Sequence, residues 1–155
     1  TTYFAKKYIE KGYKVCLLGQ SMGATVTMAV TSQVEIKNKI PCIILWVPDP
    51  ESTFDKDPDK INEEEGQKYK ELFWKEAFET NFFKNLKEYT GGIHLVYGEN
   101  DKYVSKELRD ETIKRVQEKN QSVMILKGQD HSPWEYDVCN EVYSEEIKFL
   151  EKYFS

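Results

Sequence analysis

The sequence has 155 residues, of which 39% are hydrophobic and 32% are charged, and this is enough apolar length for one folded domain with a buried core. The formal net charge is -5 and the acidic and basic residues are interspersed, which gives no electrostatic reason to bind nucleic acid or an anionic membrane surface. The longest apolar stretch, residues 40–47, is far shorter than the roughly 20 residues that a membrane-spanning helix needs. We therefore expect no nucleic-acid partner and no membrane span.

The predicted elements alternate between helices and strands along the chain. Four apolar runs rich in β-branched residues are predicted as strands: 14–19, 42–47, 93–98 and 122–128. Helical patterns occupy the intervals: 3–11 ending at Gly12, Gly23 to about Gln33, a helix after the N-cap Ser105, and a last helix with Tyr143, Ile147, Leu150 and Phe154 on one face. Because each strand is a continuous apolar run, both of its faces are expected to be buried. The sequence therefore predicts an α/β fold, a mostly parallel sheet flanked by helices.

Residues 51–90 interrupt this alternation because they are too long for a simple connection. Aromatic residues recur there in two rows at a spacing of four: Tyr69 and Phe73 in one, and Trp74, Phe78 and Phe82 in the other. Two rows cover more of a helix than one core-facing stripe. We interpret this segment as a helical insertion within a single domain spanning residues 1–155. Its aromatic rows either pack the insertion itself or belong to a lid that faces a substrate cavity.

The three cysteines do not form a recognisable disulfide or zinc pattern. Cys16 and Cys42 lie within apolar runs and Cys139 lies near the start of the last helix. An odd number of cysteines in apolar surroundings favours buried thiols in a reducing compartment. No spacing resembles a zinc site, and there is no histidine pair at helical spacing and no phosphate-binding glycine loop. We therefore expect a cytoplasmic protein without a metal or other cofactor.

The pentapeptide GQSMG at residues 19–23 has the pattern G-x-S-x-G and lies directly between a predicted strand and a predicted helix. A sharp strand-to-helix turn forces its central residue into a strained conformation and needs minimal side chains on both flanks. It also raises a serine hydroxyl above the edge of the sheet, at the positive end of a helix. The pattern predicts that Ser21 is an exposed nucleophile. The alternative is a glycine-rich turn that serves only close packing of the helix on the strand.

A serine hydroxyl is a poor nucleophile at neutral pH unless a positioned base removes its proton. The sequence offers two histidines as candidates. His94 lies inside the third predicted strand between two apolar residues, where a buried structural role is expected. His131 follows the fourth predicted strand in KGQDHSPW, at the carboxyl end of the sheet where sites of α/β proteins form. It is the candidate base.

A carboxylate is then needed to orient the imidazole of this base. Asp101 follows the third predicted strand in VYGENDKYV, again at the carboxyl end of the sheet, and it is the preferred candidate. Asp49, after the second predicted strand, is a credible substitute. Glu99 and Asp130 lie close by in the sequence and are interpreted as solvated loop charges.

Three motifs resemble those of the α/β-hydrolase superfamily, and the resemblance spans nearly the whole sequence. GQSMG resembles the nucleophile elbow, GENDKYV the acid loop G-x-x-D-x-x-V, and GQDHS the histidine loop G-x-x-H. The insertion at 51–90 lies where this family commonly carries a lid. The resemblance implies a Ser-His-Asp triad, in which Ser21 attacks a carbonyl carbon to form an acyl-enzyme, His131 transfers protons and Asp101 stabilises the imidazolium.

The sequence departs from the family pattern on the N-terminal side of the elbow. In the family, one oxyanion donor is the backbone N–H after the nucleophile, here Met22, and the other comes from a loop after an earlier strand. That loop and the strands before the elbow have no counterpart here, and the chain begins without methionine. We expect the edge of the strand at 14–19 to be covered by a leading segment or by a second copy in a homodimer. We also expect this chain alone to be weakly active or inactive.

These motifs favour a serine hydrolase acting on a small-molecule carboxylic ester with an apolar acyl group. The candidates for its substrate pocket lie in or near the segments around the predicted site: Gln20, Trp46, Trp74, Phe78, Phe82 and Trp134. An acyltransferase or a thioesterase would use the same acyl-enzyme on the same fold. A non-catalytic binding module is the alternative of another class, but such a module has no need for serine, histidine and aspartate at three strand ends.

Overall fold

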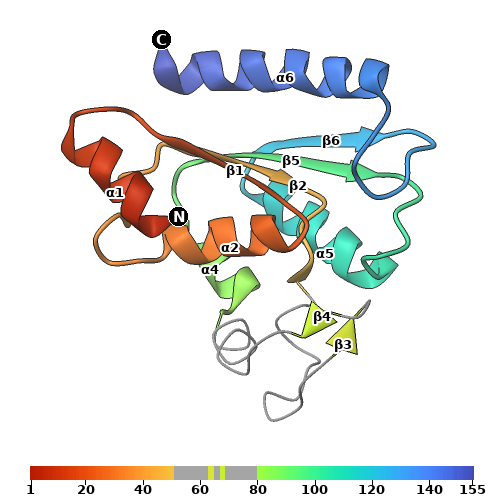
Figure 1. The fold of residues 1–155 in the computed structure, drawn as a ribbon. Helices are drawn as coiled ribbons and strands as arrows, with labels where there is room; N and C mark the ends of the chain where they lie inside the picture. The colour runs from red at the N-terminus through yellow and green to blue at the C-terminus, as the bar shows by residue number, and fades with distance from the viewer. Residues whose placement is uncertain (51–62, 65–66, 69–79) are drawn as a thin grey trace.

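The structure is a computed structural model and describes residues 1–50, 63–64, 67–68 and 80–155 (Figure 1). In chain order the elements are α1 (Thr2–Glu10), β1 (Cys16–Gln20), α2 (Met22–Thr31), β2 (Cys42–Trp46), β3 (Glu63–Glu64), β4 (Gln67–Lys68), α4 (Phe82–Glu88), β5 (Gly92–Gly98), α5 (Lys106–Glu118), β6 (Ser122–Leu126) and α6 (Tyr136–Phe154). The strands and helices predicted from the sequence lie within a few residues of these bounds.

Four of the strands form a parallel sheet in the order β1-β2-β5-β6. Every residue of β2 and of β5 is buried, because these two strands lie in the middle of the sheet and carry helices on both faces. This burial explains their continuous apolar runs. The prediction of an α/β fold with a parallel sheet flanked by helices is confirmed.

The helices form one layer on each face of the sheet (Figure 1). The long helix α6 crosses one face over β2 and β5, while α2, α4 and α5 lie on the other. Alternate residues of β1 follow this division: Leu17 is buried towards α2, whereas Leu18 points to the opposite face and is 53% exposed. β1 is an edge strand of the described sheet, and α6 does not cover it completely.

Local capping explains where several of these elements begin and end. Gly12 ends α1 with φ 86°, a conformation that glycine adopts without steric cost, and its N–H donates to the Ile9 carbonyl. The Ser105 hydroxyl accepts the N–H of Leu108 at the start of α5, as the sequence predicts for an N-cap.

The segment predicted as a helical insertion is described only in part. Residues 51–62, 65–66 and 69–79 lie outside the described residues, and β3 pairs with β4 as two short antiparallel strands. Its last part, α4, packs against α2 and α5 in the helical layer of the sheet. Phe82 and Leu86 of α4 are fully buried. The buried face of α4 therefore belongs to the main core, although the prediction placed residues 82–88 in the insertion.

No helix within the described ranges has the length and apolar character that crossing a bilayer requires. All three cysteines are free thiols. Cys16 and Cys42 are register partners on β1 and β2, so they lie side by side at one end of the sheet.

Candidate active site

The parallel sheet brings the candidate residues to one edge. Ser21 follows β1, Asp101 comes shortly after β5, and His131 lies in the loop after β6. Because the four strands are parallel, their carboxyl ends all face the same way. This edge is where the ligands of open α/β sheets bind.

Ser21 occupies a strained backbone corner. Its φ is 52° and its ψ is -126°, a conformation that costs a residue other than glycine about 1–3 kcal/mol. The Ser21 N–H donates to the carbonyl of Trp46 on the neighbouring strand at 2.8 Å, and α2 begins at the next residue. The Ser21 side chain does not cap α2. The corner therefore holds the serine between strand and helix without using its hydroxyl.

The two glycines beside this corner have different roles. A Cβ on Gly19 would lie 2.3 Å from the carbonyl oxygen of Gly23 and 2.5 Å from Oγ1 of Thr27. Only glycine therefore allows β1 to pass so close to the first turn of α2. A Cβ on Gly23 would meet no atom within 4 Å.

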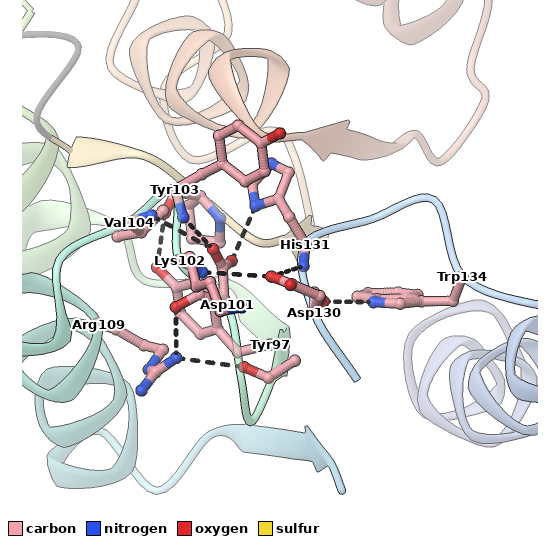
Figure 2. A network of polar contacts seen from close by, with 11 residues as sticks. Tyr97, Asp101, Lys102, Tyr103, Val104, Arg109, Asp130, His131 and Trp134 are labelled. Atoms are coloured by element: carbon pink, nitrogen blue, oxygen red, sulfur yellow. Dashed lines mark hydrogen bonds and ion pairs between the residues drawn. The ribbon is translucent and has the colours of Figure 1, made fainter. Parts of the chain in front are cut away.

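The histidine and the aspartate form a direct hydrogen bond. Nδ1 of His131 lies 2.8 Å from Oδ2 of Asp101, and the Asp101 side chain is fully buried while that of His131 is 14% exposed (Figure 2). The other carboxylate oxygen, Oδ1, accepts the backbone N–H of Tyr103 at 2.9 Å and of Val104 at 3.3 Å. A carboxylate only accepts hydrogen bonds, so in the neutral imidazole Nδ1 donates to Asp101 and Nε2 keeps its lone pair. This is the tautomer that a general base requires.

Two further residues hold this pair in place. Arg109 donates to the carbonyl oxygens of Asp101 at 3.1 Å and of Gly98 at 3.4 Å, so it fixes the backbone of the acid loop from α5. The ring of Tyr103 packs against the His131 ring, with the centroids 5.0 Å apart and the planes tilted by 49° (Figure 2). No motif in the sequence predicts these two roles.

The loop after β6 must reach back across the sheet towards Ser21. β6 is three strands away from β1, which at about 4.8 Å per strand is roughly 14 Å. Trp134 of this loop packs on Trp46 at the end of β2, with ring centroids 5.2 Å apart. The carbonyl of Trp46 in turn accepts the N–H of Ser21. Within the described residues, no hydrogen bond joins the Ser21 hydroxyl to His131, and such bonds are often long in enzymes without substrate.

The predicted substrate-pocket residues fall into different places. Trp46 and Trp134 are each only 8% exposed, and they pack together beneath α6, where Tyr143 also stacks on Trp46. Phe82 is fully buried in the core. The structure therefore gives these three aromatics packing roles instead of exposing them to a pocket. Gln20 is exposed at the end of β1, and Trp74 and Phe78 lie outside the described residues.

The structure also tests the interpretations of three other polar residues. His94 is 2% exposed and its Nδ1 contacts the Ser122 hydroxyl at 2.8 Å, which confirms the predicted structural role. Burial lowers the pKa of His94 below its ordinary value. Glu99 and Asp130 are exposed, as expected of loop charges, and in addition each carboxylate accepts a backbone N–H of the other loop.

Glu146 was missed by the sequence reasoning. It is 6% exposed on the inner face of α6, and its carboxylate accepts the indole N–H of Trp46. Burial raises the pKa of Glu146, because the charged form loses its hydration there. Glu146 lies four residues after Val142 and three before Phe149, both buried, and this core-facing spacing was the signal available in the sequence.

Within the ranges that the structure describes, no group of three or more histidine, cysteine, aspartate or glutamate side chains could hold a metal ion. The site consists of hydroxyl, imidazole and carboxylate groups. These are the groups of nucleophilic and general acid–base chemistry.

The sequence matches no family model and no curated protein. Similar folds appear among solved structures. Est1E from Butyrivibrio proteoclasticus has a TM-score of 0.68 at 20% identity, with 87% of this chain and 60% of that chain covered. A monoacylglycerol lipase from Paleococcus ferrophilus has a TM-score of 0.67 at 17% identity, covering 99% of this chain and 76% of that one. The esterase Pf2001 from Pyrococcus furiosus has a TM-score of 0.64 at 19% identity, covering 96% and 58%.

This chain has the α/β-hydrolase fold. It spans about 60% of the length of Est1E and of the Pyrococcus esterase. The described sheet and its helices therefore correspond to part of the fold in those proteins.

Proposed function

We propose that this chain carries the catalytic serine, histidine and aspartate of a serine hydrolase that cleaves carboxylic esters. The observation that carries the proposal is the buried hydrogen bond between His131 and Asp101, at the same sheet edge as the strained corner of Ser21. A glycine-rich turn that only served packing would need no such pair. The esterase and lipase names of the structural neighbours agree with this assignment.

In this proposal Ser21 is the nucleophile and His131 is its base. Nε2 of His131 takes the proton from the Ser21 hydroxyl while Oγ attacks the carbonyl carbon of the ester. The buried carboxylate of Asp101 keeps the proton on Nδ1 and stabilises the imidazolium that forms. His131 then gives the proton to the departing alkoxide, leaving an acyl group on Ser21. Water activated by the same imidazole releases the acid.

The developing oxyanion needs hydrogen-bond donors. Met22 is the first residue of α2, where a backbone N–H has no partner within the helix, so it can donate to the oxyanion. The positive end of α2 adds to this stabilisation. Removing one such donor typically costs about 3 kcal/mol of barrier, so the efficiency of this chain depends on a second donor.

The acyl group is proposed to be apolar. One solved structure of Est1E holds ferulic acid, an aromatic acid, and a second neighbour is a monoacylglycerol lipase. Esters of graded acyl length, together with aromatic acyl esters, are therefore the substrates to compare first. Adding alcohols to the same reactions distinguishes hydrolysis from acyl transfer by the products formed.

A fluorophosphonate probe tests the proposal directly, because it reacts with activated serines. The folded chain is compared with Ser21→Ala and His131→Ala, and the modified residue is identified by mass spectrometry. Ser144→Ala, at an exposed position of α6, is the matched serine control. Labelling confined to Ser21 and dependent on His131 supports the hydrolase. A folded chain without labelling refutes an assembled nucleophile in this chain, which leaves the binding module or a site that only a leading segment or a second copy completes.

A further inference from the structure

Asp130, the residue before the candidate base, links the two loops that carry the base and the acid (Figure 2). Its Oδ1 accepts the backbone N–H of His131 at 2.9 Å and that of Lys102 at 3.3 Å. Lys102 is the residue directly after Asp101. One carboxylate oxygen therefore contacts the backbone next to the acid and the backbone of the base.

The backbone of Asp130 is fixed as well. Its carbonyl oxygen accepts the indole N–H of Trp134 at 2.9 Å, and Trp134 packs on Trp46. A Cβ on Gly98 would lie 2.1 Å from the same carbonyl oxygen, so only glycine at the end of β5 lets the two loops come this close. The backbone carbonyl of Asp130 therefore contacts Trp134 on one side and the end of β5 on the other.

Other bonds between these loops do not touch the base. The Asn100 N–H donates to the Gln129 carbonyl at 2.8 Å, and the Glu99 carboxylate accepts the Gly128 N–H at 2.8 Å. These contacts bring the loops together further from the imidazole. Among the described hydrogen bonds, only the one to Asp130 joins a carboxylate to the backbone N–H of His131.

We propose that Asp130 is a positioning residue for the serine hydrolase chemistry, holding the main chain of His131 in register with the acid loop. This rests on the proposed function of Ser21, His131 and Asp101. Asp101 fixes the imidazole at Nδ1, and Asp130 fixes the backbone that carries it. With both contacts, the direction of Nε2 is set before substrate binds, and small misplacements of a catalytic group are costly in rate.

Replacing Asp130 with alanine or asparagine tests this role. Asp130→Ala removes the acceptor, and we expect the turnover number and the rate of fluorophosphonate labelling to fall about tenfold with KM and the melting temperature nearly unchanged. Asp130→Asn keeps an acceptor oxygen and should retain most of the wild-type rate. Glu141→Ala, which removes an exposed carboxylate from α6, is the control for loss of one negative charge.

Equal loss of rate in Asp130→Ala and Asp130→Asn would overturn the proposal, because the charge and not the hydrogen bonds would then matter. A change in KM alone, or no change in Asp130→Ala, would also overturn it.

Amide hydrogen exchange followed by NMR gives a readout that does not depend on catalysis. The N–H groups of Lys102 and His131 should exchange faster in Asp130→Ala, and nearly as slowly as in the wild type in Asp130→Asn. If the wild-type chain is not labelled by the probe, the proposed function fails, and unchanged exchange in Asp130→Ala separately refutes the loop contact.

Discussion

The two glycines beside Ser21 provide a matched pair of substitutions with opposite expected results. A Cβ on Gly19 would lie 2.3 Å from the Gly23 carbonyl oxygen, whereas ordinary van der Waals contact begins at 3.4 Å. Relief therefore requires a movement of 3.4 minus 2.3, or about 1.1 Å, by backbone atoms of α2. Because the nearest atoms are backbone atoms of Gly23, a change of side-chain rotamer cannot relieve this contact.

We expect Gly19→Ala to lower the free energy of unfolding by about 2 kcal/mol, within the range of about 1–3 kcal/mol found for overpacked sites. Gly23 lies in α2 with open space around its missing Cβ, so Gly23→Ala should raise the free energy of unfolding by about 0.5–1 kcal/mol through helix propensity. The two variants should thus differ by about 3 kcal/mol. Because Ser21 lies between them, Gly19→Ala should also slow fluorophosphonate labelling.

Urea unfolding followed by tryptophan fluorescence measures both free energies, since Trp46 and Trp134 are buried in the folded chain. Labelling is measured on samples shown to be folded by circular dichroism. Equal destabilisation by both alanines, or a stable and fully reactive Gly19→Ala, would refute the close approach of β1 to α2 on which the reasoning depends.

Three further predictions concern strained or buried groups. Ser21→Gly should abolish labelling yet be about 1 kcal/mol more stable than Ser21→Ala in urea unfolding, because glycine tolerates φ 52°; equal stabilities would argue against strain. Burial lowers the pKa of His94, so the unfolded chain binds its proton first and stability should fall as pH drops through about 6.5. His94→Gln should reduce that fall in unfolding titrations, and an unaltered pH profile contradicts the assignment. Burial raises the pKa of Glu146, so its charge costs stability as pH rises above about 4.5. Glu146→Gln, which still accepts from Trp46, should be more stable than the wild type at pH 7 and not at pH 4, and a loss at pH 7 would show that the charge is stabilising.

The regular elements could be predicted because each depends on local pattern. The apolar runs of β2 and β5 have no polar face, so only burial between two helical layers suits them. The turn at Gly12 and the N-cap at Ser105 depend on residues next to the helix end. The boundary of the insertion was harder, because Phe82 and Leu86 look alike whether they pack a lid or the main core.

The aromatic residues show a second limit of sequence reasoning. Trp46 ends β2 and Trp134 follows β6 at the site edge, which suggested a pocket, but their indoles turn to pack together under α6. Which way a side chain turns there depends on Glu146 and Tyr143, which are about a hundred residues away from Trp46 in the chain. No local pattern contains that information.

The sequence by itself determined the order of strands and helices along the chain, the glycine-flanked corner of Ser21, and the two loops that hold Asp101 and His131. These features follow from residue spacing and turn chemistry within short segments. Only the tertiary structure decided that the His131 imidazole bonds to Asp101, and that Asp130 accepts N–H groups from both loops. The bonds from His131 to Asp101 and from Lys102 to Asp130 join residues 30 and 28 positions apart, and they exist only when the parallel sheet has brought the ends of β5 and β6 together.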